Sequence, residues 1–243
     1  MGPGEPGKRK NKVDQINMDF DSDNIATKTT TDVVYEKLYE DIVSLKLRPG
    51  EKLSETDVAK RFNISRQPVR NAFTRLGNMD LLVIRPQKAT EVRGFSLERI
   101  AHDRFVRMAV ELEVVRCAYS NWTADMSERL EDNLHLQEQS IKSGDLAEFH
   151  ALDYNFHQML CEFGGHPHAF NIIYESKQKL DRLCVLSLEE EYEATSVLED
   201  HRDIFLALST GNSEAAVAAL RLHLHRLDAT ISNIHRQYPD YFE

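Results

Sequence analysis

The segment Ile64–Leu76, with the sequence ISRQPVRNAFTRL, decides how the N-terminal part of this chain folds. Its apolar side chains recur at the spacing of one helix face, and they are Val69, Ala72, Phe73 and Leu76. The opposite face and the first turn carry arginines and amides, the side chains that hydrogen-bond to guanine and adenine edges in a DNA major groove. Ser65 is suited to cap the helix, and Pro68 in the first turn lacks an N–H that a helix start does not need. The segment alone is compatible with a DNA-reading helix and with an ordinary solvated amphipathic helix.

The residues before this segment predict a first helix. Apolar residues at helical spacing between Val34 and Val43 form its inner face. We expect the helix to end near Leu47, because Pro49 and Gly50 follow and cannot continue it.

A second helix is expected over Glu55–Phe62. The residues from Ser54 to Asp57 resemble a capping box, in which the serine and the acidic side chain satisfy free backbone N–H groups at a helix start. Asn63 tolerates the left-handed conformation that a helix end often requires. A capped helix, a short turn and a second amphipathic helix form the helix-turn-helix arrangement.

Two short β-prone runs follow, LLVI at 81–84 and TEVR at 90–93, and they enclose the basic segment RPQKA at 85–89. Two strands around a basic tip are typical of a wing, whose tip lies on DNA phosphates or in the minor groove. We therefore predict a winged helix-turn-helix domain over residues 31–94.

The charges are divided unevenly along the 243-residue chain. The net charge is −10, but the segment from Lys60 to Arg93 holds eight lysines and arginines against two acidic residues. Residues 96–243 hold 13 basic and 26 acidic side chains. A basic segment attached to an acidic body suits a protein that presents one face to a polyanion.

Residues 1–30 are polar and rich in Gly, Pro, Lys and Asp, and we expect them to form a disordered tail. They contain no secretory signal, and the chain has no run of about 20 apolar residues that would span a membrane. Cys117, Cys161 and Cys184 are widely spaced and odd in number, which favours reduced core thiols and a cytoplasmic location.

Residues 96–237 are predicted to be helical throughout. Breaks at 144–145, 164–167 and 211–212 separate several of the helices, and the whole stretch forms six or seven helices of one antiparallel bundle, depending on how 96–122 divides. The expected fold class is therefore mainly α, with an N-terminal winged helix-turn-helix followed by a helical domain over 96–237.

A second group of chemically active side chains lies in this half. Asp153 and His157 are four residues apart on a predicted helix, so they share a face, and His201 shares its face with apolar residues. Together with His223 they could bind a divalent transition metal, because neutral imidazoles favour zinc, nickel or manganese. The side chain of His225 points away from that of His223, and His150 is a rival ligand on the Asp153 face. An ordinary surface or partly buried Asp–His pair is the alternative, and spacing alone does not bring the other histidines to it.

At this point two sets of motifs resemble a known family. The stretches PGEKLSE (49–55) and SRQPVRNAFTRL (65–76) resemble the winged helix of GntR-family transcription factors. The stretches RMAVE (107–111), DYNFH (153–157), EDH (199–201) and HL (223–224) resemble the FadR-type effector domain, called FCD. The resemblance covers about residues 32–237, with both sets in the family's order.

The resemblance implies a role for each matching residue. The DNA-binding residues would be Ser65, Arg66, Gln67, Arg70, Asn71, Lys88 and Thr90. The metal ligands would be Asp153, His157, His201 and His223, with zinc the first choice. Arg107 matches an arginine near the effector, and a guanidinium binds a carboxylate through two parallel hydrogen bonds. A plain helical ion pair of Arg107 with Glu111 is the alternative.

The chain departs from the family pattern at the wing. Ala89 stands where the wing tip usually has glycine, and Asp80 stands at another position that is commonly glycine. The wing turn and its reading of bases could therefore differ from those of the family.

Taken with these features, the resemblance implies a homodimeric repressor that binds a near-palindromic double-stranded operator and responds to a small carboxylic acid bound beside the metal. Two recognition helices would enter major grooves about 34 Å apart. One alternative is a purely structural metal, and a second is a metal-dependent hydrolase, since an open zinc site can activate water. No residue stands out as a general base, so we expect no enzyme activity.

Overall fold

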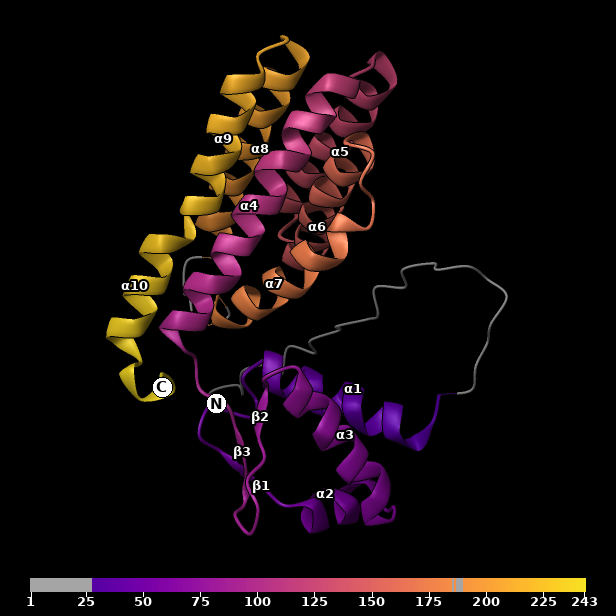
Figure 1. Ribbon diagram of the computed structural model, residues 1–243, viewed down its shortest axis with the longest axis vertical. Helices are drawn as coiled ribbons and strands as arrows, with labels where there is room; N and C mark the ends of the chain where they lie inside the picture. Colours follow the sequence, from indigo (N-terminus) through magenta and orange to yellow (C-terminus); the bar gives the residue numbers. More distant parts are fainter. Residues whose placement is uncertain (1–27, 185, 187–189) are drawn as a thin grey trace, which may run out of the picture.

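The computed structural model describes residues 28–184, 186 and 190–243 of the chain. The predicted tail at 1–30 therefore lies almost wholly outside the described residues. A small N-terminal part with three helices and three strands lies below a long helical bundle (Figure 1). The predicted fold class is confirmed.

The N-terminal part packs three helices on one apolar core: α1 (Thr30–Val43), α2 (Glu55–Phe62) and α3 (Arg66–Asn78). The apolar face predicted for α3 is fully used, since Val69, Ala72, Phe73 and Leu76 are all buried. Asn63 ends α2 in the left-handed conformation, with φ 54° and ψ 49°. This turn makes the reversal between α2 and α3 that the helix-turn-helix requires.

The helix starts differ from the prediction in detail. A complete capping box is present at α1, between Thr29 and Asp32, where none was predicted. At α2 only the Ser54 half is present, with the Asp57 N–H donating to the Ser54 hydroxyl at 3.4 Å. Ser65 occupies the N-cap position of α3, but its hydroxyl makes no capping hydrogen bond to the helix.

The wing is part of a three-stranded antiparallel sheet and not of a two-stranded hairpin alone. Its strands are β1 (Lys52–Leu53), β2 (Leu82–Val83) and β3 (Thr90–Val92), in the order β1-β3-β2. The extra strand β1 was not predicted. The first helix also ends earlier than predicted, at Val43, because the backbone turns at Leu45 with a φ of 56°.

The helical part contains seven helices, within the predicted number: α4 (Leu97–Asn121), α5 (Ala124–Ser143), α6 (Leu146–Phe163), α7 (Ala169–Cys184), α8 (Glu190–Ser209), α9 (Ser213–His225) and α10 (Leu227–Gln237) among the residues described. A single helix was expected over 213–237. It divides because the Arg226 N–H donates to the His223 carbonyl, three residues back, which interrupts the regular ladder. Across the described ranges, no helix is long and apolar enough to cross a membrane.

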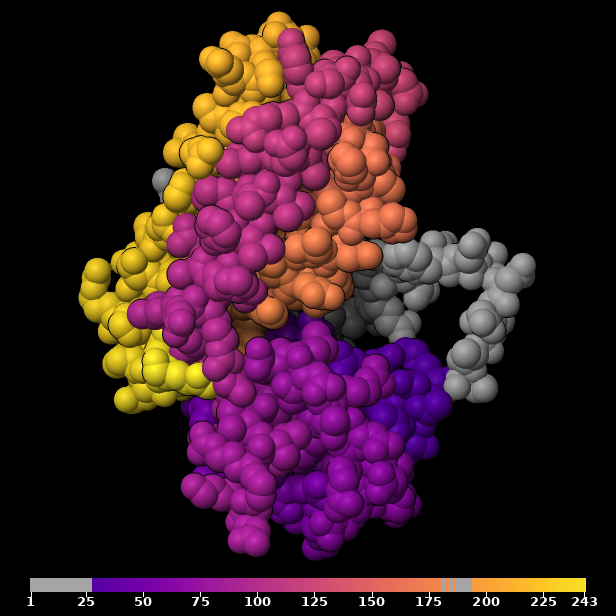
Figure 2. Space-filling model, viewed as in Figure 1, coloured from indigo at the N-terminus to yellow at the C-terminus, as the bar shows by residue number. Residues whose placement is uncertain are grey.

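The connection between the two parts is held by the end of the chain. Phe95, just before α4, pairs with Phe242 in a parallel β-bridge, and its N–H donates to the Tyr241 carbonyl at 2.8 Å. A side chain at Gly94 would come within 3.0 Å of that same carbonyl oxygen. Arg182 of α7 donates to the Arg93 carbonyl and covers the Phe95 ring. Figure 2 shows the C-terminal end of the chain packed against the start of α4.

Candidate DNA-binding surface and metal centre

The outer face of α3 presents the side chains predicted to contact DNA. Ser65, Arg66, Gln67, Arg70 and Asn71 are all exposed. Gln67 donates to Asn71 at 3.1 Å, so the two amides are held side by side one helical turn apart. The buried apolar residues of α3 lie on its other face, so this outer face is available to a partner.

The wing adds basic side chains from two segments of the chain. Lys88 is exposed and Thr90 is half-buried at the start of β3. A hollow of about 350 Å³ lies beside them, and its charged lining residues are Lys52, Arg85, Lys88 and Glu91. Sequence reasoning did not assign Lys52 to the wing, because β1 joins the sheet through pairing with the distant β3.

The two departures from the family pattern have different structural consequences. The positive φ at the wing tip falls on Gln87, at 58°, so Ala89 adopts an ordinary backbone conformation. Asp80 does take up a left-handed conformation, also with φ 58°. Aspartate tolerates this region better than most residues, so the substitution for glycine at position 80 is accommodated.

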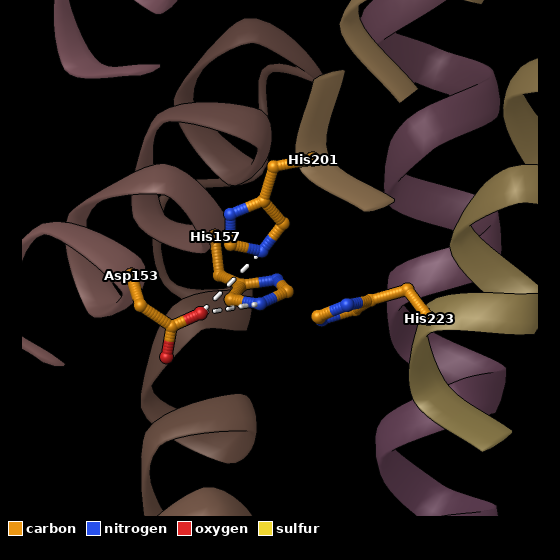
Figure 3. A group of neighbouring side chains, drawn as sticks. All are labelled: Asp153, His157, His201 and His223. Carbon is orange, nitrogen blue, oxygen red and sulfur yellow. Dashed lines mark ion pairs between the residues drawn. The ribbon is translucent and has the colours of Figure 1, made fainter. Parts of the chain in front are cut away.

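Asp153, His157, His201 and His223 converge inside the helical bundle (Figure 3). The first two come from α6, the third from α8 and the fourth from α9. One potential ligand atom from each lies within 4.8 Å of all the others, and all four side chains are buried. Opposite ligands of one ion bound at 2.0–2.2 Å would lie at most about 4.4 Å apart, so the cluster is close to the dimensions of a metal site.

A different polar side chain lies near the Nδ1 atom of each histidine, and only the His201 contact has the geometry of a hydrogen bond. The His157 Nδ1 atom lies 2.6 Å from Oε2 of Glu111. The His201 Nδ1 atom lies 2.9 Å from the side-chain oxygen of Gln137. The His223 Nδ1 atom lies 3.4 Å from Oδ2 of Asp200. The Nε2 atoms of His157 and His201 face Oδ1 of Asp153, at 3.6 and 3.4 Å. Such outer partners fix the tautomer and ring orientation of metal-binding histidines.

The Nε2 atom of His201 supplies a direct test of fit. It is fully buried, faces Asp153 Oδ1 at 3.4 Å and makes no hydrogen bond within the described part of the chain. Buried polar atoms are seldom left without a partner. A metal ion bound by three imidazoles and one carboxylate would satisfy it.

Electrostatics favour neutral imidazoles at two positions. Burial lowers the pKa of His201 well below its usual value, and burial also lowers the pKa of His223. Burial opposes the charge on His157 too, but the neighbouring Glu111 and Asp153 carboxylates raise the pKa of His157 above its usual value. Burial opposes the charge on Asp153, but Lys177 and then His157 hold the pKa of its carboxyl well below the usual range, so it stays ionised.

Two buried cations flank the cluster. Arg107 donates from Nε to Glu111 at 2.6 Å, and its Nη2 lies 3.3 Å from Nε2 of His157. Arg107 therefore forms the ion pair with Glu111 and also reaches the cluster, while its effector role stays a prediction. Lys177 of α7 contacts Asp153 through Oδ2 at 2.8 Å, whereas the histidines face Oδ1. Sequence reasoning missed Lys177, Gln137 and Asp200 as supporting residues.

The rival histidines lie outside the cluster. His150 is exposed, one turn before Asp153. His225 is exposed on the far side of α9 and lies 3.0 Å from Asp228.

Comparison with known proteins assigns a family to each part of the chain. Residues 30–92 match the family of bacterial regulatory proteins called gntR, and residues 104–226 match the FCD domain. The chain is 35% identical over 216 residues to the HTH-type transcriptional repressor RspR of Escherichia coli K12, covering 89% of this chain and 95% of that protein. It is 30% identical over 230 residues to the HTH-type transcriptional repressor NanR of Citrobacter rodentium, covering 85% of this chain and 86% of that protein. A crystal structure of a GntR transcriptional regulator from Rhodococcus sp. RHA1 has a TM-score of 0.63 at 26% identity, covering 84% of this chain and 97% of that one.

Proposed function

Because the chain belongs to the GntR family, with an FCD domain following its DNA-binding part, we propose that it is a repressor controlled by an organic acid and a metal. It is a DNA-binding transcriptional regulator and not an enzyme. In the proposal, a small carboxylic acid binds beside a divalent metal ion in the bundle and changes operator affinity.

The observation that carries the metal proposal is the buried group of three histidines and Asp153, with one potential ligand atom of each within 4.8 Å of all the others. Asp153, His157, His201 and His223 would hold the ion, and zinc suits this donor set, with nickel and manganese as alternatives. A bound ion would supply a Lewis-acidic position for an effector carboxylate. Arg107 lies next to the cluster and could hold that carboxylate from the other side.

The proposed recognition residues are Ser65, Arg66, Gln67, Arg70 and Asn71 on α3, with Lys88 and Thr90 on the wing. The arginines and amides suit major-groove bases, and the wing lysine suits a phosphate or the minor groove. Changing both Arg66 and Arg70 to Ala should abolish preference for the operator, because each two-donor pairing with a base contributes about 1–3 kcal/mol of discrimination.

A near-palindromic operator would be bound by a homodimer, and the α4–α9 surface supports one. Phe105 of α4 is 72% exposed and Leu222 of α9 is 64% exposed, on two helices that pack together. A hollow of about 570 Å³ lies beside Leu222 and is bordered by both Arg116 and Glu214, so a second copy could place opposite charges against it. Because α4 directly follows the wing, a two-fold axis here would bring the two DNA-binding parts close together.

One experiment tests the regulatory proposal. Metal content is measured on the purified protein, and thermal melting is recorded with a panel of small carboxylic acids before and after chelation. We expect one class of acid to raise the melting temperature of the metal-loaded protein only, and to weaken binding to DNA from its own upstream region. Acid binding that survives chelation would contradict a site beside the metal.

A purely structural metal is the second candidate, and the Arg107–Glu111 pair favours it. Arg107 already has a buried carboxylate at 2.6 Å, so an effector would have to share or displace that partner. In this case chelation would lower the melting temperature while every acid in the panel leaves DNA binding unchanged.

A further inference from the structure

Glu55 contacts both arginines that are proposed to read DNA. Arg66 donates from Nη2 to Oε2 of Glu55 at 3.0 Å. Arg70 donates from Nε to Oε1 at 3.2 Å and from Nη2 to Oε2 at 3.1 Å. One carboxylate of α2 therefore connects the first two turns of α3.

The backbone fixes where this carboxylate lies. Glu55 is the first residue of α2, directly after its cap Ser54, and the left-handed Asn63 brings the first turns of α2 and α3 together. The Glu55 side chain is 24% exposed, whereas those of Arg66 and Arg70 are 59% and 56% exposed. The carboxylate thus lies beneath two guanidinium groups that remain open to solvent on their outer side.

The contact also determines which edge of Arg70 can meet a base. Glu55 takes the edge formed by Nε and Nη2. The edge formed by the two terminal nitrogens is directed away from Glu55. Reading of guanine needs two parallel N–H donors on one edge, and the terminal edge supplies them.

We propose that Glu55 is a positioning residue for base reading, which holds the guanidinium groups of Arg66 and Arg70 side by side in the orientation that meets operator bases. This inference rests on the proposed recognition role of the two arginines. Exposed ion pairs contribute little to folding stability, so the contact has its main consequence in the geometry of the DNA-binding face.

The charge of Glu55 has a second consequence for specificity. Hydrogen bonds from Arg70 and then Arg66 hold the pKa of Glu55 below its usual value, so the carboxylate is ionised at neutral pH. It offsets one of two adjacent positive charges and so weakens their attraction for the phosphates of any DNA. Glu55 should therefore raise the preference for the operator by lowering binding to other sequences.

The test compares Glu55→Gln with Asp57→Asn, an exposed residue in the same helical turn that loses the same charge. Affinity is measured at several salt concentrations for the duplex that the wild-type protein enriches from a random library, and for a scrambled duplex. We expect Glu55→Gln to lower the ratio of operator affinity to scrambled-DNA affinity about tenfold. Binding to scrambled DNA should become stronger, and the slope of its log affinity against log salt concentration should become steeper by up to about one. Asp57→Asn should leave the ratio unchanged.

The same substitution in a variant that lacks Arg70 separates a positioning role of Glu55 from a merely structural one. In Arg70→Ala the substitution Glu55→Gln should lower the ratio by less than it does in the wild-type protein, because only Arg66 remains for Glu55 to orient. An unchanged ratio in Glu55→Gln, or an equal fall in the Arg70→Ala background, would overturn the inference. If Arg66→Ala with Arg70→Ala binds the enriched duplex as well as wild type does, the recognition role itself is wrong and the inference falls with it.

Discussion

His223 and His225 lie two residues apart on α9 and face opposite sides of the helix. The first is 7% exposed and belongs to the four-residue cluster, whereas the second is exposed beside Asp228. They therefore form a matched pair for testing the proposed metal centre.

We expect His223→Ala to lose bound metal and His225→Ala to keep it. Loss of one of four ligands should also remove the stabilisation that the ion provides, which is about 2.7 kcal/mol when free metal is present at 100 times its Kd. Metal analysis after dialysis, with melting curves before and after chelation, checks both variants. Equal metal content in the two would exclude the cluster as the binding site.

Gln137 provides a test of how the cluster is supported. Its side-chain oxygen lies 2.9 Å from Nδ1 of His201, and its amide donates to Asn133 at 2.6 Å. Gln137→Leu should free the His201 ring and weaken metal binding about 10–100-fold. Gln139→Leu, at an exposed position of the same helix, is the control, and competition with a metal indicator gives the affinities.

Arg107 and Arg116 both form ion pairs within α4, at opposite extremes of burial. The Arg107–Glu111 side chains are 6% and 3% exposed, whereas those of Arg116–Glu113 are 49% and 68% exposed. Arg107→Ala leaves a buried carboxylate and should cost about 3–5 kcal/mol of stability, against about 0–1 kcal/mol for Arg116→Ala. Urea unfolding measures both.

Arg107→Lys distinguishes an effector role from this structural one. It keeps the buried charge but removes the paired donors that bind a carboxylate. We expect it to fold and to bind DNA while the response to acids falls. A response equal to that of wild type would leave Arg107 as a structural residue.

Cys161 should resist alkylation in the folded protein. Burial raises the pKa of its thiol from 9.0 to about 12, so little reactive thiolate forms at pH 8–9. The unfolded thiol ionises from about pH 9, so the folded state binds the proton more tightly and loses stability as pH rises from 9 toward 12. Iodoacetamide labelling with peptide mapping should show Cys161 reacting only in denaturant, with the half-buried Cys117 reacting first.

Replacing exposed apolar side chains with glutamate tests the proposed dimer surface. Phe105→Glu combined with Leu222→Glu should give monomers in light scattering at micromolar concentration and weaken operator binding. Leu136→Glu with Leu206→Glu, on α5 and α8, changes side chains that are 48% and 59% exposed and serves as the control. If the control pair alone gives monomers, the dimer forms through the other side of the bundle.

Local patterns predicted the helices better than the contacts between them. The apolar spacing of Val69 to Leu76 and the turn at Asn63 depend on neighbours in sequence, and both are confirmed. Strand β1 was missed because two residues carry no periodicity, and Lys52 gains its pairing only from Glu91 far along the chain. The split at Arg226 was missed since no proline or glycine marks it.

The candidate site shows the same difference between local sequence patterns, which were predictable, and contacts between distant elements, which were not. Asp153 and His157 share a helix face by spacing alone, but only the resemblance joined them to His201 and His223. Gln137 could not be assigned, because its place beside His201 depends on how α5 packs against α8. Glu55 resembled an ordinary helix-start acid, and its contacts with α3 follow from the angle between two helices.

The β-bridge between Phe95 and Phe242 has a practical consequence for exchanging parts between relatives. A chimera joined at residue 96 would carry its own linker residue Phe95 but meet a foreign segment at 238–243, where Tyr241 and Phe242 contact Phe95 in this chain. Arg93 and Arg99 also share the acidic partners Asp80 and Glu243 across the same junction. Transplanting the DNA-binding part therefore requires transplanting the last six residues of this chain with it.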